Sequence, residues 1–222
     1  MKSLSVTHAV ALAMIASTPS ISAATQEPRL HAAAARGDVP AIRALLQAGA
    51  RVDARDATQQ TPLLVATRLN HVDAARVLVD AGADVNAKDA IQDSAYLYAG
   101  ARGHLEILRL TLDHGANLES TNRYGGTALI PAAERGHVEA VRMLIEAGVD
   151  VDHVNRLNWT ALLEAIILGN GGKQHSDIVQ LLVEAGADVD LADGDGVTPL
   201  QHARRRGYAQ IERILVAAGA KS

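Results

Sequence analysis

Residues 122–149, NRYGGTALIPAAERGHVEAVRMLIEAGV, contain two short markers that recur along the chain at a fixed spacing. One is a T-A-L triplet that starts at Thr127, and the other is an A-G-V triplet centred on Gly148. Glycines equivalent to Gly148 stand at positions 49, 82, 115, 186 and 219, in steps of 33, 33, 33, 38 and 33 residues. Counterparts of the T-A-L triplet begin at Thr61, Ser94, Thr160 and Thr198. Two markers in one phase predict a one-dimensional stack of about six repeated units.

The same stretch indicates how one unit folds. Gly125 can adopt a positive φ in the opening turn at no steric cost, and Thr127 is placed to be the N-cap of a first helix over 128–135. The second helix turns Leu144 towards the neighbouring units and stops at Gly148. Helices this short are marginal alone in water, so the stability of the chain must come from contacts between units.

The opening turns of the second and third units differ from the later ones. Gly125, Asn158 and Gly196 are residue types that tolerate a left-handed backbone, whereas Gln59 and Gln92 occupy the equivalent positions in the earlier turns. We therefore expect those two turns to be distorted or less rigid.

A period of 33 residues with T-P-L triplets and G-A turns resembles the ankyrin repeat. Segments close to the consensus of that family are AGADVNA at 81–87, GHLEI at 103–107 and DGDGVTPL at 193–200. The resemblance covers residues 30–220. It implies an all-α solenoid of about six helix-turn-helix units with short projecting finger turns and capping terminal units. It also implies a protein-binding scaffold without catalysis, although the fold does not specify the partner.

The N-terminus lies outside the repeat phase and resembles the leader of exported bacterial ankyrin proteins. Residues 1–24 show an early lysine, an apolar stretch over 9–16 and a small-residue exit, the pattern of a secretory signal cleaved after Ala23 or Ala24. The apolar stretch is too short to span a bilayer, so we expect no stable membrane insertion. A frayed amphipathic arm is the alternative. Export predicts a periplasmic or secreted protein whose single repeat domain, 25–222, has units at 25–53, 54–86, 87–119, 120–152, 153–190 and 191–222.

Composition argues against several classes of function. With 21 Lys and Arg against 25 Asp and Glu, the net charge is −4, which provides no basic field for nucleic acid. The absence of cysteine removes disulfides, thiolate metal sites and thiol nucleophiles together. We expect a monomer that binds protein and uses no cofactor.

Four of the nine histidines share one repeat position, the start of the second helix: His71, His104, His137 and His175. Ankyrin repeats often carry histidine there to hydrogen-bond the turn, so the resemblance implies a structural role. A zinc site is the alternative, but the chain shows neither an H-E-x-x-H motif nor histidines paired at i and i+4. We expect no metal.

The longer step between glycines 148 and 186 comes from five extra residues, 170–174. This glycine-rich segment fails the Walker phosphate-binding pattern, because position 167 is Ile and position 174 is Gln. The adjacent H-S-D triplet is no catalytic triad, since consecutive residues cannot surround one reacting atom. The insertion therefore indicates either a binding surface or a neutral length variant.

The strongest functional signal is a set of side chains that the stack does not need for its core. In ankyrin folds, the fingers and the ends of the first helices line a concave face. Tyr, Trp and Arg are enriched in binding hot spots, and the only Trp of the chain is in this set. The candidate partner-binding residues are Arg123, Tyr124, Arg156, Leu157, Trp159, Ile167, Leu168, Asp195 and Arg205. The alternative is that Trp159 packs on the neighbouring finger and that the insertion covers Ile167 and Leu168.

These observations favour a periplasmic adaptor or inhibitor that grips a protein through this face. An accessory or protective factor for an exported enzyme or toxin is a second hypothesis. An enzyme is a third and weaker one, because the sequence offers no nucleophile paired with a base and no metal-ligand set.

Overall fold

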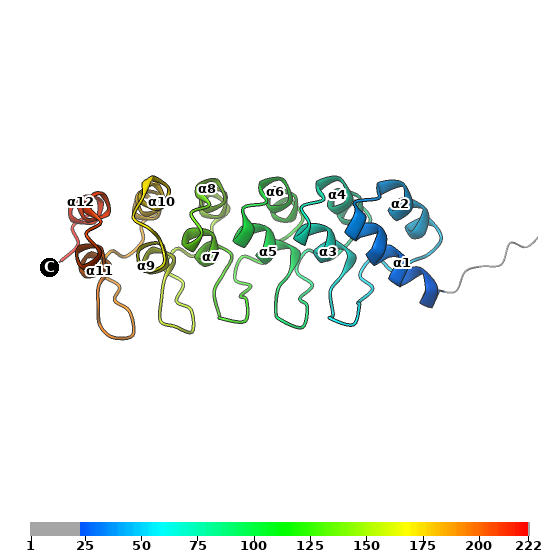
Figure 1. Cartoon of the computed structure of the whole chain (residues 1–222), viewed down its shortest axis with the longest axis horizontal. Coiled ribbons are helices and arrows are strands. Elements are labelled where there is room, and N and C mark those ends of the chain that lie inside the picture. Colours follow the sequence, from blue (N-terminus) through cyan, green and yellow to red (C-terminus); the bar gives the residue numbers. More distant parts are fainter. Residues whose placement is uncertain (1–22, 222) are drawn as a thin grey trace, which may run out of the picture.

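The computed structural model describes residues 23–221 as a row of paired helices (Figure 1). Side chains are described from Gln26 onward, so the predicted signal peptide lies outside the described residues, apart from the backbone of Ala23 and Ala24. Between residues 23 and 221 every regular element is a helix, and the all-α prediction is confirmed. In this range no helix combines the length and the apolar composition that a membrane crossing requires.

The helices form six consecutive pairs, which we number units one to six. The fingers, which are the turns before the first helices of units two to six, project from one side of the row, and the second helices lie on the other side (Figure 1). The pairs are α1 (Ala23–Arg36) with α2 (Val39–Gln47), α3 (Pro62–Arg68) with α4 (Val72–Asp80), α5 (Ala95–Arg102) with α6 (Leu105–Asp113), α7 (Leu129–Glu134) with α8 (Val138–Ala147), α9 (Ala161–Ile167) with α10 (Lys173–Glu184), and α11 (Pro199–Arg206) with α12 (Ala209–Ala217).

Hydroxyl caps start most of the first helices. The Thr61 hydroxyl accepts a hydrogen bond from the backbone N–H of Leu64 at 3.2 Å, and Thr160 caps α9 in the same way. Thr198 forms a complete capping box with Gln201, since each side chain accepts from the backbone N–H of the other residue. Each cap satisfies donors that have no partner within the helix.

Unit four departs from the predicted cap. Its first helix begins at Leu129, one residue later than predicted, and the Thr127 hydroxyl is buried without a hydrogen-bond partner in the described part of the chain. The physical reason is Pro131, which has no N–H. In unit two the N–H of Val65 reaches the Thr61 carbonyl at 3.0 Å and closes the first helical turn, but proline at the equivalent position cannot make this bond.

All five fingers share one hydrogen-bonded turn, and the expected distortion of the two glutamine turns is wrong. Gln59 and Gln92 have φ values of 64° and 66°, close to the 75° of Gly125. In the second unit, the Asp56 carboxylate accepts from the N–H groups of Thr58 and Gln60 at 2.8 and 2.9 Å. These bonds hold the left-handed conformation at a residue type that does not prefer it.

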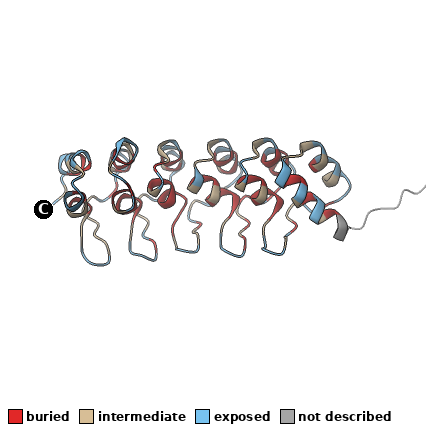
Figure 2. Cartoon of the chain, viewed as in Figure 1, coloured by how far each residue is buried: buried red, intermediate tan, exposed pale blue. Residues whose placement is uncertain are grey.

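The core is a continuous apolar layer between neighbouring units, drawn as the red inner faces of the helices in Figure 2. Leu144 of α8 is fully buried. A Cβ placed on Gly100 of α5 would lie 2.9 Å from the Ala128 Cβ and 3.5 Å from Leu144 Cδ1, so units three and four are in close contact there. The predicted inward direction of Leu144 is confirmed, and the stack depends on contacts between units.

The shared histidine position joins neighbouring units. His71, His104 and His175 each bond through a ring nitrogen to a backbone carbonyl in the unit before, at 3.1, 3.0 and 2.9 Å. The rings thus bond to the end of a neighbouring first helix, and the His175 ring also bonds to the Asn170 side-chain oxygen of its own turn at 3.0 Å. The insertion gives α10 an earlier start, so that His175 lies inside this helix and not at its first residue. Among the described residues, no three His, Asp or Glu side chains come close enough to share a metal ion.

Candidate functional site

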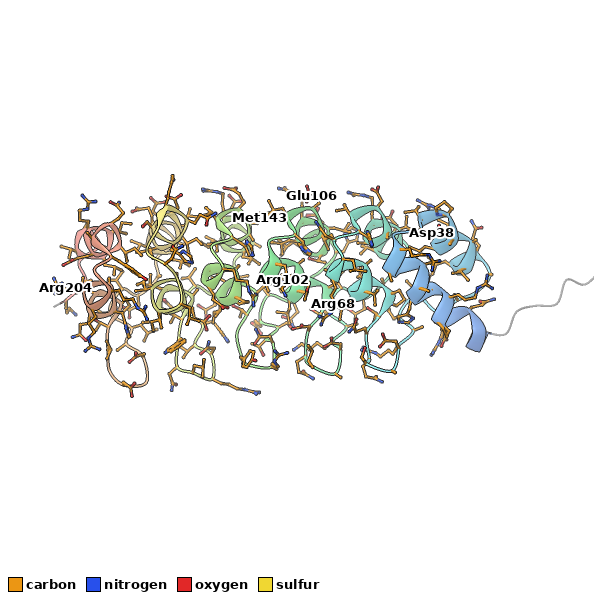
Figure 3. The ribbon with its side chains drawn as sticks, viewed as in Figure 1. Asp38, Arg68, Arg102, Glu106, Met143 and Arg204 are labelled. Atoms are coloured by element: carbon orange, nitrogen blue, oxygen red, sulfur yellow. The ribbon has the colours of Figure 1, made fainter. Side chains whose placement is uncertain are left out.

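A groove of about 370 Å³ lies between the fingers and the first helices of units three to five. Residues of these three fingers line it together with residues of α5, α7 and α9, and Arg68 of α3 joins them. Figure 3 shows Arg68 and Arg102 on neighbouring first helices, near the level at which the helices meet the fingers. The groove therefore spans the middle of the stack on the finger side.

An exposed apolar row follows the finger side of the groove. Ile91, Tyr124 and Leu157 occupy one position in three successive fingers, 33 residues apart, and they are 42, 55 and 53% exposed. Leu168, at the end of α9, is 51% exposed and lines the same groove. The described residues include seven large hydrophobic side chains that are exposed, and four of them line this groove. Folding does not require this concentration of exposed apolar side chains, which makes the groove the candidate functional site.

Basic side chains at the unit-three end are held in fixed positions. The Arg68 guanidinium lies 2.9 Å from an Asp89 oxygen and 3.0 Å from an Asp93 oxygen. It also lies over the Tyr98 ring, 4.6 Å from the ring centroid, and Arg102 approaches the same ring at 5.5 Å. Burial raises the pKa of Asp93, and the Arg68 charge opposes that shift. At this end of the groove, ion pairs and cation–π contacts connect the arginines to two aspartates and one aromatic ring.

The fingers of units four and five are tied to each other by their arginines. The Arg156 backbone N–H donates to the Tyr124 carbonyl at 3.0 Å, and the Arg156 guanidinium donates to the Arg123 carbonyl at 2.9 Å. The Arg123 guanidinium lies 4.8 Å from the centroid of the Tyr124 ring. These contacts connect the backbones of the two fingers and place the Arg123 guanidinium against the Tyr124 ring.

A buried carboxyl group lies on the helix side of the groove. Glu164 of α9 is 6% exposed and accepts a hydrogen bond from the Asn155 side-chain amide at 2.8 Å. The pKa of Glu164 is raised to about 7: burial is the largest cause and the Glu134 charge adds to it, whereas the Asn155 hydrogen bond and the Arg135 charge oppose the shift. The groove thus combines an apolar row with a carboxyl group that titrates near neutrality.

The chain matches the model of a known protein family along most of its length. The family model described as ankyrin repeats in three copies matches residues 10–89, 96–193 and 147–222. The chain belongs to the ankyrin repeat family. No curated protein sequence matches it significantly.

Solved structures of ankyrin repeat proteins resemble the chain along most of its length. An ankyrin repeat domain from Acinetobacter baumannii AYE is 66% identical, with a TM-score of 0.85, over 86% of this chain and 98% of that one. The ankyrin repeat protein EF0377 is 42% identical, with a TM-score of 0.83, over 88% and 98%. The ankyrin repeat domain of Bcl-3, a member of the IκB family, is 32% identical, with a TM-score of 0.78, over 87% of each chain. Ankyrin repeats are in general protein-interaction scaffolds.

Only some of the predicted partner-binding residues line the groove. Arg123, Tyr124, Leu157 and Leu168 line it. Leu168 is half-exposed, so the insertion does not cover this side chain. The inserted residues lie elsewhere, beside a second hollow between α10 and α12, where Gly171 packs against the Tyr208 ring.

The other predicted residues lie outside the groove lining. Trp159 and Ile167 are half-buried, and Arg156 acts as the brace between two fingers. Asp195 and Arg205 are exposed on the sixth ankyrin repeat. The groove therefore lies closer to the N-terminus than the predicted patch.

Sequence reasoning missed Ile91, Pro131 and Glu164, all of which line the groove. Ile91 could have been found, because it is the 33-residue counterpart of Tyr124 in the third finger. Glu164 offered a weaker signal, namely an acid inside an otherwise apolar helix whose counterpart in unit two is Val65. Its burial and its hydrogen bond to Asn155 of the finger before α9 are features that sequence spacing alone does not show.

Proposed function

We propose that the protein binds another protein through the groove across ankyrin repeats three to five. The exposed row of Ile91, Tyr124 and Leu157 is the observation that carries this proposal. Residues that recur with the period of the repeat at the finger tips present an apolar strip at regular spacing. A partner that covers this strip removes it from water and gains roughly 25 cal/mol for each Å² of apolar surface buried.

The composition of the groove supports a protein partner over a small molecule. The groove is open along its length and mixes aromatic, aliphatic and arginine side chains, the types that dominate protein-binding hot spots. Arg123 and Tyr124 already contact each other, so this anchor needs little ordering when it binds. No enzymatic step is part of the proposal.

We further propose that the protein acts in the bacterial periplasm. The basic, apolar and small-residue segments before residue 25 support export, and the chain contains no cysteine that an oxidising compartment could crosslink. Sequencing the N-terminus of the protein purified from its native host checks this. We expect the mature chain to begin at Ala24 or Thr25. A cytosolic chain that keeps its N-terminal segment would contradict export.

Chemical crosslinking in periplasmic extract, followed by mass spectrometry, tests the binding proposal. We expect a defined partner that crosslinks to the wild-type chain and is lost with the double variant Tyr124→Ala/Leu157→Ala. Leu69→Ala is the matched control, because Leu69 is as exposed as Leu157, at 53%, but lies outside the groove. A partner that the double variant captures as well as the wild-type chain would contradict the proposed site.

A further inference from the structure

The carboxyl group of Glu164 occupies a repeat position where folding does not require an acid. The equivalent residues in units two, three and four are Val65, Tyr98 and Pro131. Glu164 is nonetheless almost fully buried, and it lines the groove. A buried carboxyl group lowers the stability of the fold unless its oxygens accept hydrogen bonds. Stability therefore does not explain why an acid occupies this position.

One oxygen of this carboxyl group is already occupied. The Asn155 side-chain oxygen accepts from the N–H groups of Leu157 and Trp159 at 2.9 and 3.1 Å, so the Asn155 amide nitrogen must be the group that faces Glu164. This nitrogen donates to Glu164 Oε1 at 2.8 Å. Glu164 Oε2 makes no hydrogen bond within the described residues and is the oxygen left for a ligand.

A second polar group in the lining also lacks a partner. Thr127 is 2% exposed, and its hydroxyl makes no hydrogen bond in the described part of the chain, because Pro131 prevents the regular helix start. Thr127 and Glu164 line the same groove, and Glu134 lies close enough to raise the pKa of Glu164. The helix side of the groove therefore offers unpaired acceptors behind an apolar rim.

The charges around Glu164 complete this environment. On α7, the Arg135 guanidinium donates to the Ala101 carbonyl at 2.8 Å and lies 3.9 Å from Glu134. On α10, His175 bonds to the Glu134 carbonyl, and on α11, His202 is paired with a carboxylate of its own finger. These three side chains are engaged elsewhere, and none of them bonds directly to the Glu164 carboxylate.

We propose that Glu164 and Glu134 receive a cationic side chain, arginine or lysine, which the protein partner inserts past Tyr124 and Leu157. This inference rests on the proposed binding function of the groove. The aliphatic stem of the guest packs on the apolar rim, and its charged head reaches the free oxygen of Glu164. Glu164 is thus the residue that sets specificity, whereas Tyr124 and Leu157 supply apolar contact.

Ionisation of Glu164 makes the recognition dependent on pH. A cation binds the ionised carboxylate, and with a pKa near 7 the ionised fraction rises from about 0.1 at pH 6 to about 0.9 at pH 8. The apparent affinity is proportional to the fraction of protein in the competent state. We therefore expect the Kd for a cationic segment to fall about tenfold between pH 6 and pH 8.

Selection of random phage-displayed peptides on the purified full chain at pH 8 tests the proposal. The wild-type protein is expected to enrich peptides with an arginine or lysine flanked by apolar residues. Glu164→Gln should lose the cationic preference and the pH dependence while keeping the apolar preference. Glu106→Gln is the control, because Glu106 is exposed on α6, on the side away from the fingers (Figure 3).

The outcomes separate the two proposals. If Glu164→Gln selects the same cationic peptides as the wild-type chain, or if the wild-type chain selects acidic peptides, the role of Glu164 is refuted and the groove still stands as a binding site. If the wild-type chain enriches no peptide that Tyr124→Ala/Leu157→Ala loses, the groove itself is refuted, and the specificity inference falls with it. Circular dichroism spectra of all variants confirm that they are folded.

Discussion

Unit two and units four and five have the same finger and helix pair, but they differ at one position of the first helix. Unit two has Val65 there, which packs against the core, and its helix start is fully capped. Units four and five have Pro131 and Glu164, which line the groove. Pro131 lacks the N–H that a regular helix start uses, and Glu164 places a carboxyl group in a buried position. The stack therefore tolerates residues that are costly to folding at the groove, as expected when a surface is kept for binding.

The largest effect is expected from breaking the stack itself. Leu144→Ala removes a fully buried side chain between units three and four, and it should lower the free energy of unfolding by about 2 to 5 kcal/mol. Leu157→Ala changes the same residue type on the exposed rim and should cost under about 0.5 kcal/mol. Urea unfolding of both variants checks the contrast. Equal unfolding midpoints would mean that the exposed groove residue contributes as much to stability as the buried residue of the stack.

The next largest effect on the free energy of unfolding is expected from the buried carboxyl group of Glu164, and it depends on pH. The folded-state pKa of Glu164 is raised from 4.5 to about 7, so the folded chain holds this proton more tightly than the unfolded chain. Stability should therefore fall by about 3 kcal/mol in total as pH rises from about 4.5 to about 7, and it should stay level above that range.

Glu164→Gln removes this contribution and keeps an acceptor for Asn155. The stability advantage of the variant should grow between pH 5 and pH 7, as measured by urea unfolding at several pH values. Glu106→Gln, at an exposed position, supplies the control. A constant difference between wild-type and variant chains across this range would show that Glu164 titrates normally.

A smaller increase in stability is expected when the first helix of unit four is changed to resemble that of unit two. Pro131→Val restores an N–H that can reach the Thr127 carbonyl and allows the Thr127 hydroxyl to cap the helix. The variant should be more stable by about 1 kcal/mol, the typical net value of a hydrogen bond. Thermal unfolding measures this change. A lower midpoint would indicate that the proline ring contributes packing that outweighs the missing bond.

The backbone of the stack was predictable from sequence because each unit repeats local signals. The threonine caps, the glycine stops and the inward direction of Leu144 follow from residue types at fixed spacing. The start of α7 was not predicted, although Pro131 is visible in the sequence, because the cap was inferred from Thr127 alone. The glutamine turns were misjudged because carboxylate hydrogen bonds outweigh the preference of the residue.

The groove was only partly predictable, since it depends on how neighbouring units lie together. Tyr124 and Leu157 could be placed on fingers from the period alone. The charge network around Arg68 joins residues that are 21 and 25 positions apart in the chain, and repeat spacing does not reveal which side chains meet there. The burial of Glu164 arises from packing around α9, which repeat spacing does not reveal either. The half-burial of the unique Trp159, and its place outside the groove lining, were likewise not visible in the sequence.

Calorimetric titration of the captured partner into the purified chain tests the central claim most directly. Tyr124→Ala/Leu157→Ala should weaken binding by about 2 kcal/mol or more, about a thirtyfold rise in Kd, while its melting temperature stays near that of the wild-type chain. The Leu69→Ala control should bind like the wild-type chain. Wild-type affinity in the folded double variant would contradict the assignment of the groove as the binding site.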